Sequence, residues 1–141
     1  MDKRQIDELL SENGTAIFSE NLPLKYGVFY RGWTNYLIGK RLIIDDSPTK
    51  LKILYALNSQ EISAAFDSSS IPYLESYYSA SWPADNMVAI ASLALKTKIT
   101  KESKTTISSV DTWMSTVKSK LDKHGRIPHA VNWKTGNTVQ E

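Results

Sequence analysis

The sequence contains no cysteine and only two histidines, His124 and His129, among its 141 residues. Without cysteine, the chain has no disulfide, no zinc–thiolate site and no cysteine nucleophile. The two histidines lack the spacing of a metal-ligand pair, so we expect neither a metal nor any other cofactor. The sequence also lacks a glycine-rich phosphate loop and the G-x-S-x-G turn of serine hydrolases.

A concentration of charge and a long apolar run are missing as well. The net charge is +2, with lysine and arginine spread along the chain, so a nucleic-acid partner is not expected. The longest apolar stretch, Met87–Leu95, is shorter than the run of about 20 residues that crosses a bilayer, so no membrane span is expected. With 41% hydrophobic and 23% charged residues, residues 1–141 fit a single globular domain.

The N-terminal segment MDKRQIDELLSEN is charged and lacks the apolar centre of a signal peptide. Taken as a native N-terminus, it predicts a cytoplasmic protein. A start created by truncation would look the same, so the localisation stays open.

The most informative stretch is 71–96, where an aromatic, polar loop changes into an apolar helix. Pro83 suits the first turn of a helix, and Asp85 follows where the helix dipole favours a carboxylate. All residues but one from Met87 to Leu95 are apolar, which is typical of a helix buried on every side. We therefore expect a central buried helix that carries Asp85 and Asn86 at its beginning, beneath the loop.

Apolar spacing, capping residues and helix breakers predict four further helices. We expect them over residues 2–12, 26–42, 48–67 and 109–124, with caps at Asp2, Ser47 and Ser108, a stop at Asn13-Gly14 and an interruption near Asn58-Ser59. Trp33 and Trp113 are expected in the core, residues 97–106 as a polar linker, and residues 126–133 as a loop or short strand. Gly32 and Gly39 weaken their helix by ~1 kcal/mol each relative to alanine, and they would permit close approach of another helix. The pattern predicts an all-α fold of stacked antiparallel helical hairpins with long functional loops on one face.

Two segments carry a resemblance to a known architecture. PYLESYYSASWPADN before the apolar helix and HGRIPHAVNWKTG after the next helix resemble parts of (α/α) toroids, such as six-hairpin glycosidases and the linalool dehydratase-isomerase type. The resemblance covers the second half of the chain and implies an active site in the funnel formed by the loops. A closed toroid needs more hairpins than 141 residues supply. The chain would then be a fragment of a larger toroid, a subunit completed by self-association, or a lookalike.

Three residues are candidates for catalysis, and each has a structural alternative. Asp85 fits a general acid or base with Glu75 as its carboxylate partner, a chemistry used in glycoside hydrolysis. It equally fits a carboxylate that binds backbone N–H groups at a helix start, with Glu75 in solvent. His129 fits an acid–base group, or a half-buried histidine bonded to a carbonyl.

The aromatic residues of the loop suggest a binding surface. Tyr73, Tyr77, Tyr78 and Trp82, with Asn86, would bind a small-molecule or glycan ligand, because aromatic side chains with polar tips suit ligand pockets. The alternative is that they close the ends of the helical layers. Two functions follow. The first is a toroid-type enzyme that acts on a carbohydrate or a similar hydroxylated substrate. The second is a non-catalytic binding or scaffold module that uses the aromatic loop 71–83.

Overall fold

The computed structural model describes residues 3–45, 48–101 and 108–141, and these are mostly helical. The helices are α1 (Lys3–Leu9), α2 (Glu12–Thr15), α3 (Gly27–Ile44), α4 (Thr49–Ser68), α5 (Pro83–Ala94), α6 (Lys96–Thr100) and α7 (Ser108–Thr116), followed by the 3₁₀ helix η1 (Val117–Lys120). Strands β1 (Ala130–Val131) and β2 (Thr138–Gln140) pair antiparallel. The prediction of an all-α protein is confirmed at this level.

Several helix boundaries differ from those predicted. Asn13 and Gly14 lie inside α2, because the Ser11 side chain accepts a hydrogen bond from the Gly14 N–H (3.1 Å) and caps a second helix. Helix α4 runs without interruption through Asn58 and Ser59. Both side chains accept hydrogen bonds from α3, which explains polar residues in mid-helix.

The other differences lie near the helix ends. Pro48 is the N-cap of α4 rather than its first helical residue. Part of the predicted polar linker is helical, as α6, and Ser108 is the first residue of α7 rather than its cap. The last helical stretch ends at Lys120, earlier than predicted. The predicted caps Asp2 and Ser47 lie outside the described residues.

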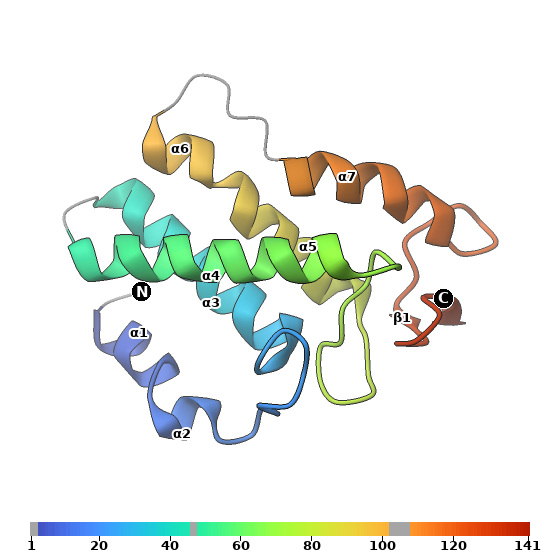
Figure 1. The fold of residues 1–141 in the computed structure, drawn as a ribbon, viewed down its shortest axis with the longest axis horizontal. Helices are drawn as coiled ribbons and strands as arrows, with labels where there is room; N and C mark the ends of the chain where they lie inside the picture. Colours follow the sequence, from blue (N-terminus) through green and yellow to red (C-terminus); the bar gives the residue numbers. More distant parts are fainter. Residues whose placement is uncertain (1–2, 46–47, 102–107) are drawn as a thin grey trace.

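Helix α3 is the centre of the packing. It crosses α5 closely enough that a Cβ on Gly32 would lie 2.9 Å from the Cβ of Ala89. Figure 1 shows α4 passing in front of both helices and the β1–β2 hairpin beside the loop that precedes α5. Helix α1 packs on α3, and α2 follows α1. One core cluster joins α3, α4, α5 and α7, and contains Leu24, Val28, Ile62, Phe66, Tyr73, Ala89, Ile90, Leu93, Trp113, Val117 and Val131. A second cluster joins α1, α3 and α4, and contains Ile6, Ile38, Leu42 and Tyr55.

Two predictions about the core are wrong. Trp33 is 41% exposed, whereas Trp113 is buried as predicted. Helix α5 is not buried on every side, since Met87 is 45% exposed. Both differences arise because α3 and α5 bury small and polar residues against each other, which leaves Trp33 and Met87 facing outward.

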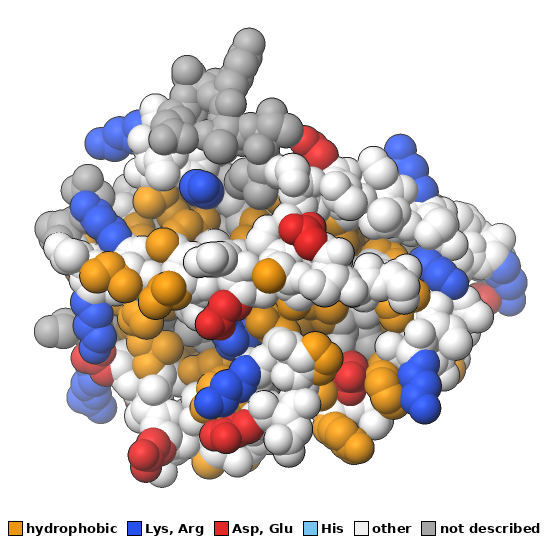
Figure 2. Space-filling view, in the orientation of Figure 1, with side chains coloured by type: hydrophobic (Ala, Val, Ile, Leu, Met, Phe, Trp, Pro, Cys, Tyr) orange, Lys and Arg blue, Asp and Glu red, His pale blue; other side chains and the backbone are white. Residues whose placement is uncertain are grey.

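The described chain has no membrane-spanning helix, and the face shown in Figure 2 has no basic patch. None of its helices is both long enough and apolar enough to cross a membrane. Lysine and arginine side chains are scattered among acidic ones on the face shown in Figure 2, rather than gathered in one patch.

Candidate functional site

The loop before α5 is held in place by a buried asparagine. Asn86 is fully buried, and its Oδ1 accepts a hydrogen bond from the Leu74 N–H (2.7 Å). Its Nδ2 donates to the carbonyls of Leu74 (3.2 Å) and Trp82 (3.1 Å). Asn86 therefore clamps both ends of the loop to the first turn of α5, and its amide is occupied by the protein rather than presented to a ligand.

Further bonds tie the same loop to its neighbours. The Val28 N–H donates to the Glu75 carbonyl (2.9 Å), and the Val131 N–H donates to the Ser81 carbonyl (3.1 Å). Gly27 has a positive φ of 80°, and a Cβ there would lie 2.3 Å from the Ser76 carbonyl oxygen. Since only glycine permits this approach, the loop packs directly on the start of α3.

Asp85 lies half-buried in the first turn of α5. Burial raises the pKa of its carboxyl group, while hydrogen bonds from the side chains of Ser76 and Trp33 act in the opposite direction. The Ser76 hydroxyl oxygen also accepts the Trp82 N–H (3.1 Å), so it links the loop to the carboxylate. None of the ion pairs found among the described residues involves Asp85. Asp85 is thus a carboxylate with neutral donors and no cationic partner in this part of the chain.

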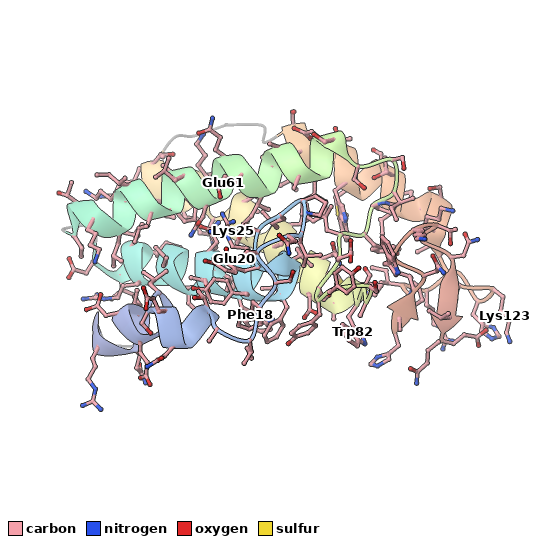
Figure 3. The ribbon with its side chains drawn as sticks, turned by 60° about the horizontal axis from the view of Figure 1, so that its bottom comes forward. Phe18, Glu20, Lys25, Glu61, Trp82 and Lys123 are labelled. Atoms are coloured by element: carbon pink, nitrogen blue, oxygen red, sulfur yellow. The ribbon has the colours of Figure 1, made fainter. Side chains whose placement is uncertain are left out.

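Trp33 and Tyr77 lie close to this carboxylate, and the rings that contact Tyr77 extend the same surface. We call this surface the aromatic face: Phe18, Phe29, Trp33, Tyr77 and Trp82. The Tyr77 ring stacks on Phe29 (5.4 Å between centroids, 25°) and on Phe18 (5.8 Å, 21°). The Trp82 ring meets Tyr77 nearly at a right angle (5.6 Å, 84°). Burial raises the pKa of the Tyr77 hydroxyl, and the negative charge of Asp85 raises it further. Figure 3 shows Phe18 and Trp82 along the same lower edge of the molecule, although they come from distant segments of the chain.

Glu75 and Tyr73 are not part of the aromatic face. The Glu75 carboxylate accepts the Ser79 N–H (2.7 Å) and closes the turn at the tip of the loop. Tyr73 is 1% exposed, and its hydroxyl donates to the Lys120 carbonyl (3.1 Å). Both residues line a hollow of about 900 Å³ that is also lined by Arg31 and Trp133, and Asp85 is not part of its wall.

The last two predicted residues lie at the margin. Tyr78 is 73% exposed, and none of the ring pairs found in the described chain includes it. His129 is exposed just before β1, where its backbone N–H donates to the Gln140 carbonyl (2.9 Å). The structure therefore groups Asp85, Tyr77 and Trp82, and it places Glu75, Tyr73 and Tyr78 elsewhere.

Sequence reasoning missed four members of this site: Phe18, Phe29, Trp33 and Ser76. A usable signal was present in α3, where Phe29 and Trp33 are one helical turn apart. The small residues Gly32 and Gly39 lie on a different face of α3, and that face is the buried one. Phe18 carries no local signal, because only the fold brings it to Tyr77.

Within the residues that the structure describes, no group of three or more histidine, cysteine or acidic side chains is arranged to hold a metal ion. Comparison of the chain with models of protein families, with curated proteins and with solved structures finds no match.

Proposed function

We propose that this chain is a binding module that takes a small-molecule or glycan ligand on the aromatic face. The observation that carries the proposal is a set of partly exposed rings beside Asp85, a half-buried carboxylate without a cationic partner in the described chain. Burial of a charge without a counter-charge is costly. A ligand that supplies hydrogen-bond donors or positive charge at this point would reduce that cost.

The loop is suited to this role because it is already ordered. Its hydrogen bonds to Asn86, Val28 and Val131 hold Tyr77 and Trp82 in position before any ligand arrives. Preorganised side chains lose less conformational entropy on binding, so more of the contact energy contributes to affinity.

The test is a titration followed by the indole N–H signals of Trp33 and Trp82 in ¹H–¹⁵N spectra. The panel would contain methyl glycosides, polyols, carboxylates and ammonium compounds. We expect a saturable shift of both signals. The shift of the Trp33 signal should be lost in Trp82→Ala and kept in the matched control Tyr78→Ala. Shifts confined to Trp133, which lies in the hollow lined by Glu75 and Tyr73, would contradict the proposal.

A second candidate is a toroid-type enzyme domain acting on a hydroxylated substrate, with Asp85 as general acid. It is favoured by the raised pKa of Asp85, which suits proton donation. It is weakened by the position of Glu75, whose carboxylate is bonded at the loop tip rather than associated with Asp85. Hydrolysis of aryl glycosides that is lost in Asp85→Asn, but kept in Asp111→Asn, would favour the enzyme over the binding module.

A further inference from the structure

The ligand chemistry of the aromatic face follows from its charge. From Ile71 to Leu95 the sequence contains two acidic residues, Glu75 and Asp85, and no lysine, arginine or histidine. Arg31 of α3 is engaged elsewhere, where it donates to Glu61, Asn58 and the Lys25 carbonyl. The charge beside the rings is therefore negative, and the protein does not neutralise it from these segments.

The angle between the rings adds a second constraint. Tyr77 and Trp82 meet at 84°, so they form a corner rather than a flat platform. A sugar stacks its flat face on one ring, and it also needs several polar side chains for its hydroxyl groups. The nearby Ser76 hydroxyl is already engaged with the Trp82 N–H and the Asp85 carboxylate. A compact cation, in contrast, is attracted to the face of each ring, and two rings at a right angle can both present a face to the same cation.

We propose that the aromatic face binds an organic cation bearing a methylated ammonium group, with Trp82, Tyr77 and Trp33 around the methyl groups and Asp85 as the counter-charge. Such a group is weakly hydrated and apolar in outline, so it suits aromatic walls better than a bare ammonium does. The same group occurs in free quaternary amines and in methylated lysine side chains. This inference rests on the proposed binding function and specifies the ligand class of the same site.

The test compares choline with its neutral carbon isostere, 3,3-dimethylbutan-1-ol, by titration calorimetry at fixed ionic strength. We expect choline to bind at least about tenfold more tightly, because the two molecules share a shape and differ in charge. Asp85→Asn should weaken choline binding by about tenfold or more without changing that of the isostere. The matched control is Asp111→Asn, which removes an exposed carboxylate from the first turn of another helix, α7, and should leave both affinities unchanged.

Changes in the rings separate the contribution of the aromatic walls from that of the charge. Trp82→Ala should abolish binding of choline and isostere alike, and Trp82→Phe should restore part of it. Thermal unfolding of each variant establishes that the loop is still folded. If Trp82→Ala unfolds the loop, Trp82→Phe with its intermediate affinity still tests the proposal, and unchanged choline affinity in a folded Trp82→Phe would overturn it.

The outcomes distinguish this inference from the proposed function. Equal affinity for choline and the isostere, or a saturable shift of the Trp82 indole by methyl glycosides alone, would overturn the inference and leave the binding module standing. An aromatic face that responds to no compound of the panel would overturn both. If choline binds, comparison with a peptide that carries trimethyl-lysine identifies the source of the cation, because tighter binding of the peptide indicates a protein partner.

Discussion

Replacement of Asn86 by alanine tests the central structural conclusion, that one buried amide holds the loop on α5. The substitution removes three hydrogen bonds, two to Leu74 and one to Trp82. The three lost hydrogen bonds differ in how much their loss costs in stability. The Leu74 carbonyl keeps a bond from the Ser81 hydroxyl (2.8 Å), and the Trp82 carbonyl keeps a bond from the Asp85 N–H (3.1 Å). The Leu74 N–H is left without a partner.

The magnitude follows from these unequal losses. A buried donor left unsatisfied costs about 1–3 kcal/mol, and each of the other two bonds contributes about 0.5–1.5 kcal/mol. Alanine recovers up to about 0.7 kcal/mol through its higher helix propensity. We therefore expect Asn86→Ala to lower the free energy of unfolding by about 2–4 kcal/mol, roughly 6–12 °C in melting temperature for a domain of this size.

The assay is urea unfolding followed by tryptophan fluorescence, together with hydrogen exchange of the Leu74 amide. Exchange at Leu74 should accelerate in Asn86→Ala more than exchange in the core of α3. The matched control is Asn21→Ala at an exposed position, which should change stability by less than about 0.5 kcal/mol. A loss in Asn86→Ala no larger than in this control, with protection of the Leu74 amide unchanged, would refute the clamp.

Two further predictions concern helix packing and pH. Gly32→Ala should destabilise the protein by about 1–2 kcal/mol, because overpacking against Ala89 exceeds the gain in helix propensity. Gly39→Ala should cost less, since its Cβ would meet movable side chains, and equal losses in urea unfolding would contradict this. Backbone and side-chain hydrogen bonds, with the Arg126 charge, lower the pKa of Asp122, so its contribution to stability is present above its unfolded pKa and disappears as the pH falls through the folded one. Burial raises the pKa of Asp85, so its contribution has the opposite sign and is lost as the pH rises through the folded value. Melting temperatures of Asp122→Asn and Asp85→Asn between about pH 3 and pH 6 should therefore depart from the parent in opposite directions, and parallel curves would contradict both assignments.

Local signals in the sequence act over a few residues, and structure that depends on such signals was predictable. Pro83 stands at the first turn of α5 as expected, because its fixed φ and missing N–H suit that position. Trp113 is buried, and α3 occupies nearly its expected range. The glycines of α3 also indicated a close helix crossing, which the structure shows between Gly32 and Ala89.

Where a residue lies relative to segments that are distant in the sequence was decided only by the tertiary structure. The apolar spacing of α3 allows either of two faces to be buried. In the structure α5 packs on the face that carries glycine and asparagine, so Trp33 lies on the other face, beside Asp85. Glu75 and Asp85 are ten residues apart in the sequence and do not meet in the structure. The Glu75 carboxylate accepts the Ser79 N–H in the loop turn, whereas Asp85 lies in the first turn of α5. The aromatic face depends on Phe18 meeting Tyr77 across 59 positions of sequence, and no local pattern encodes such a contact. Helix starts and polar turns follow from short-range sterics and hydrogen bonding, whereas the choice of buried face and the neighbours of a carboxylate depend on the free energy of the whole packed chain.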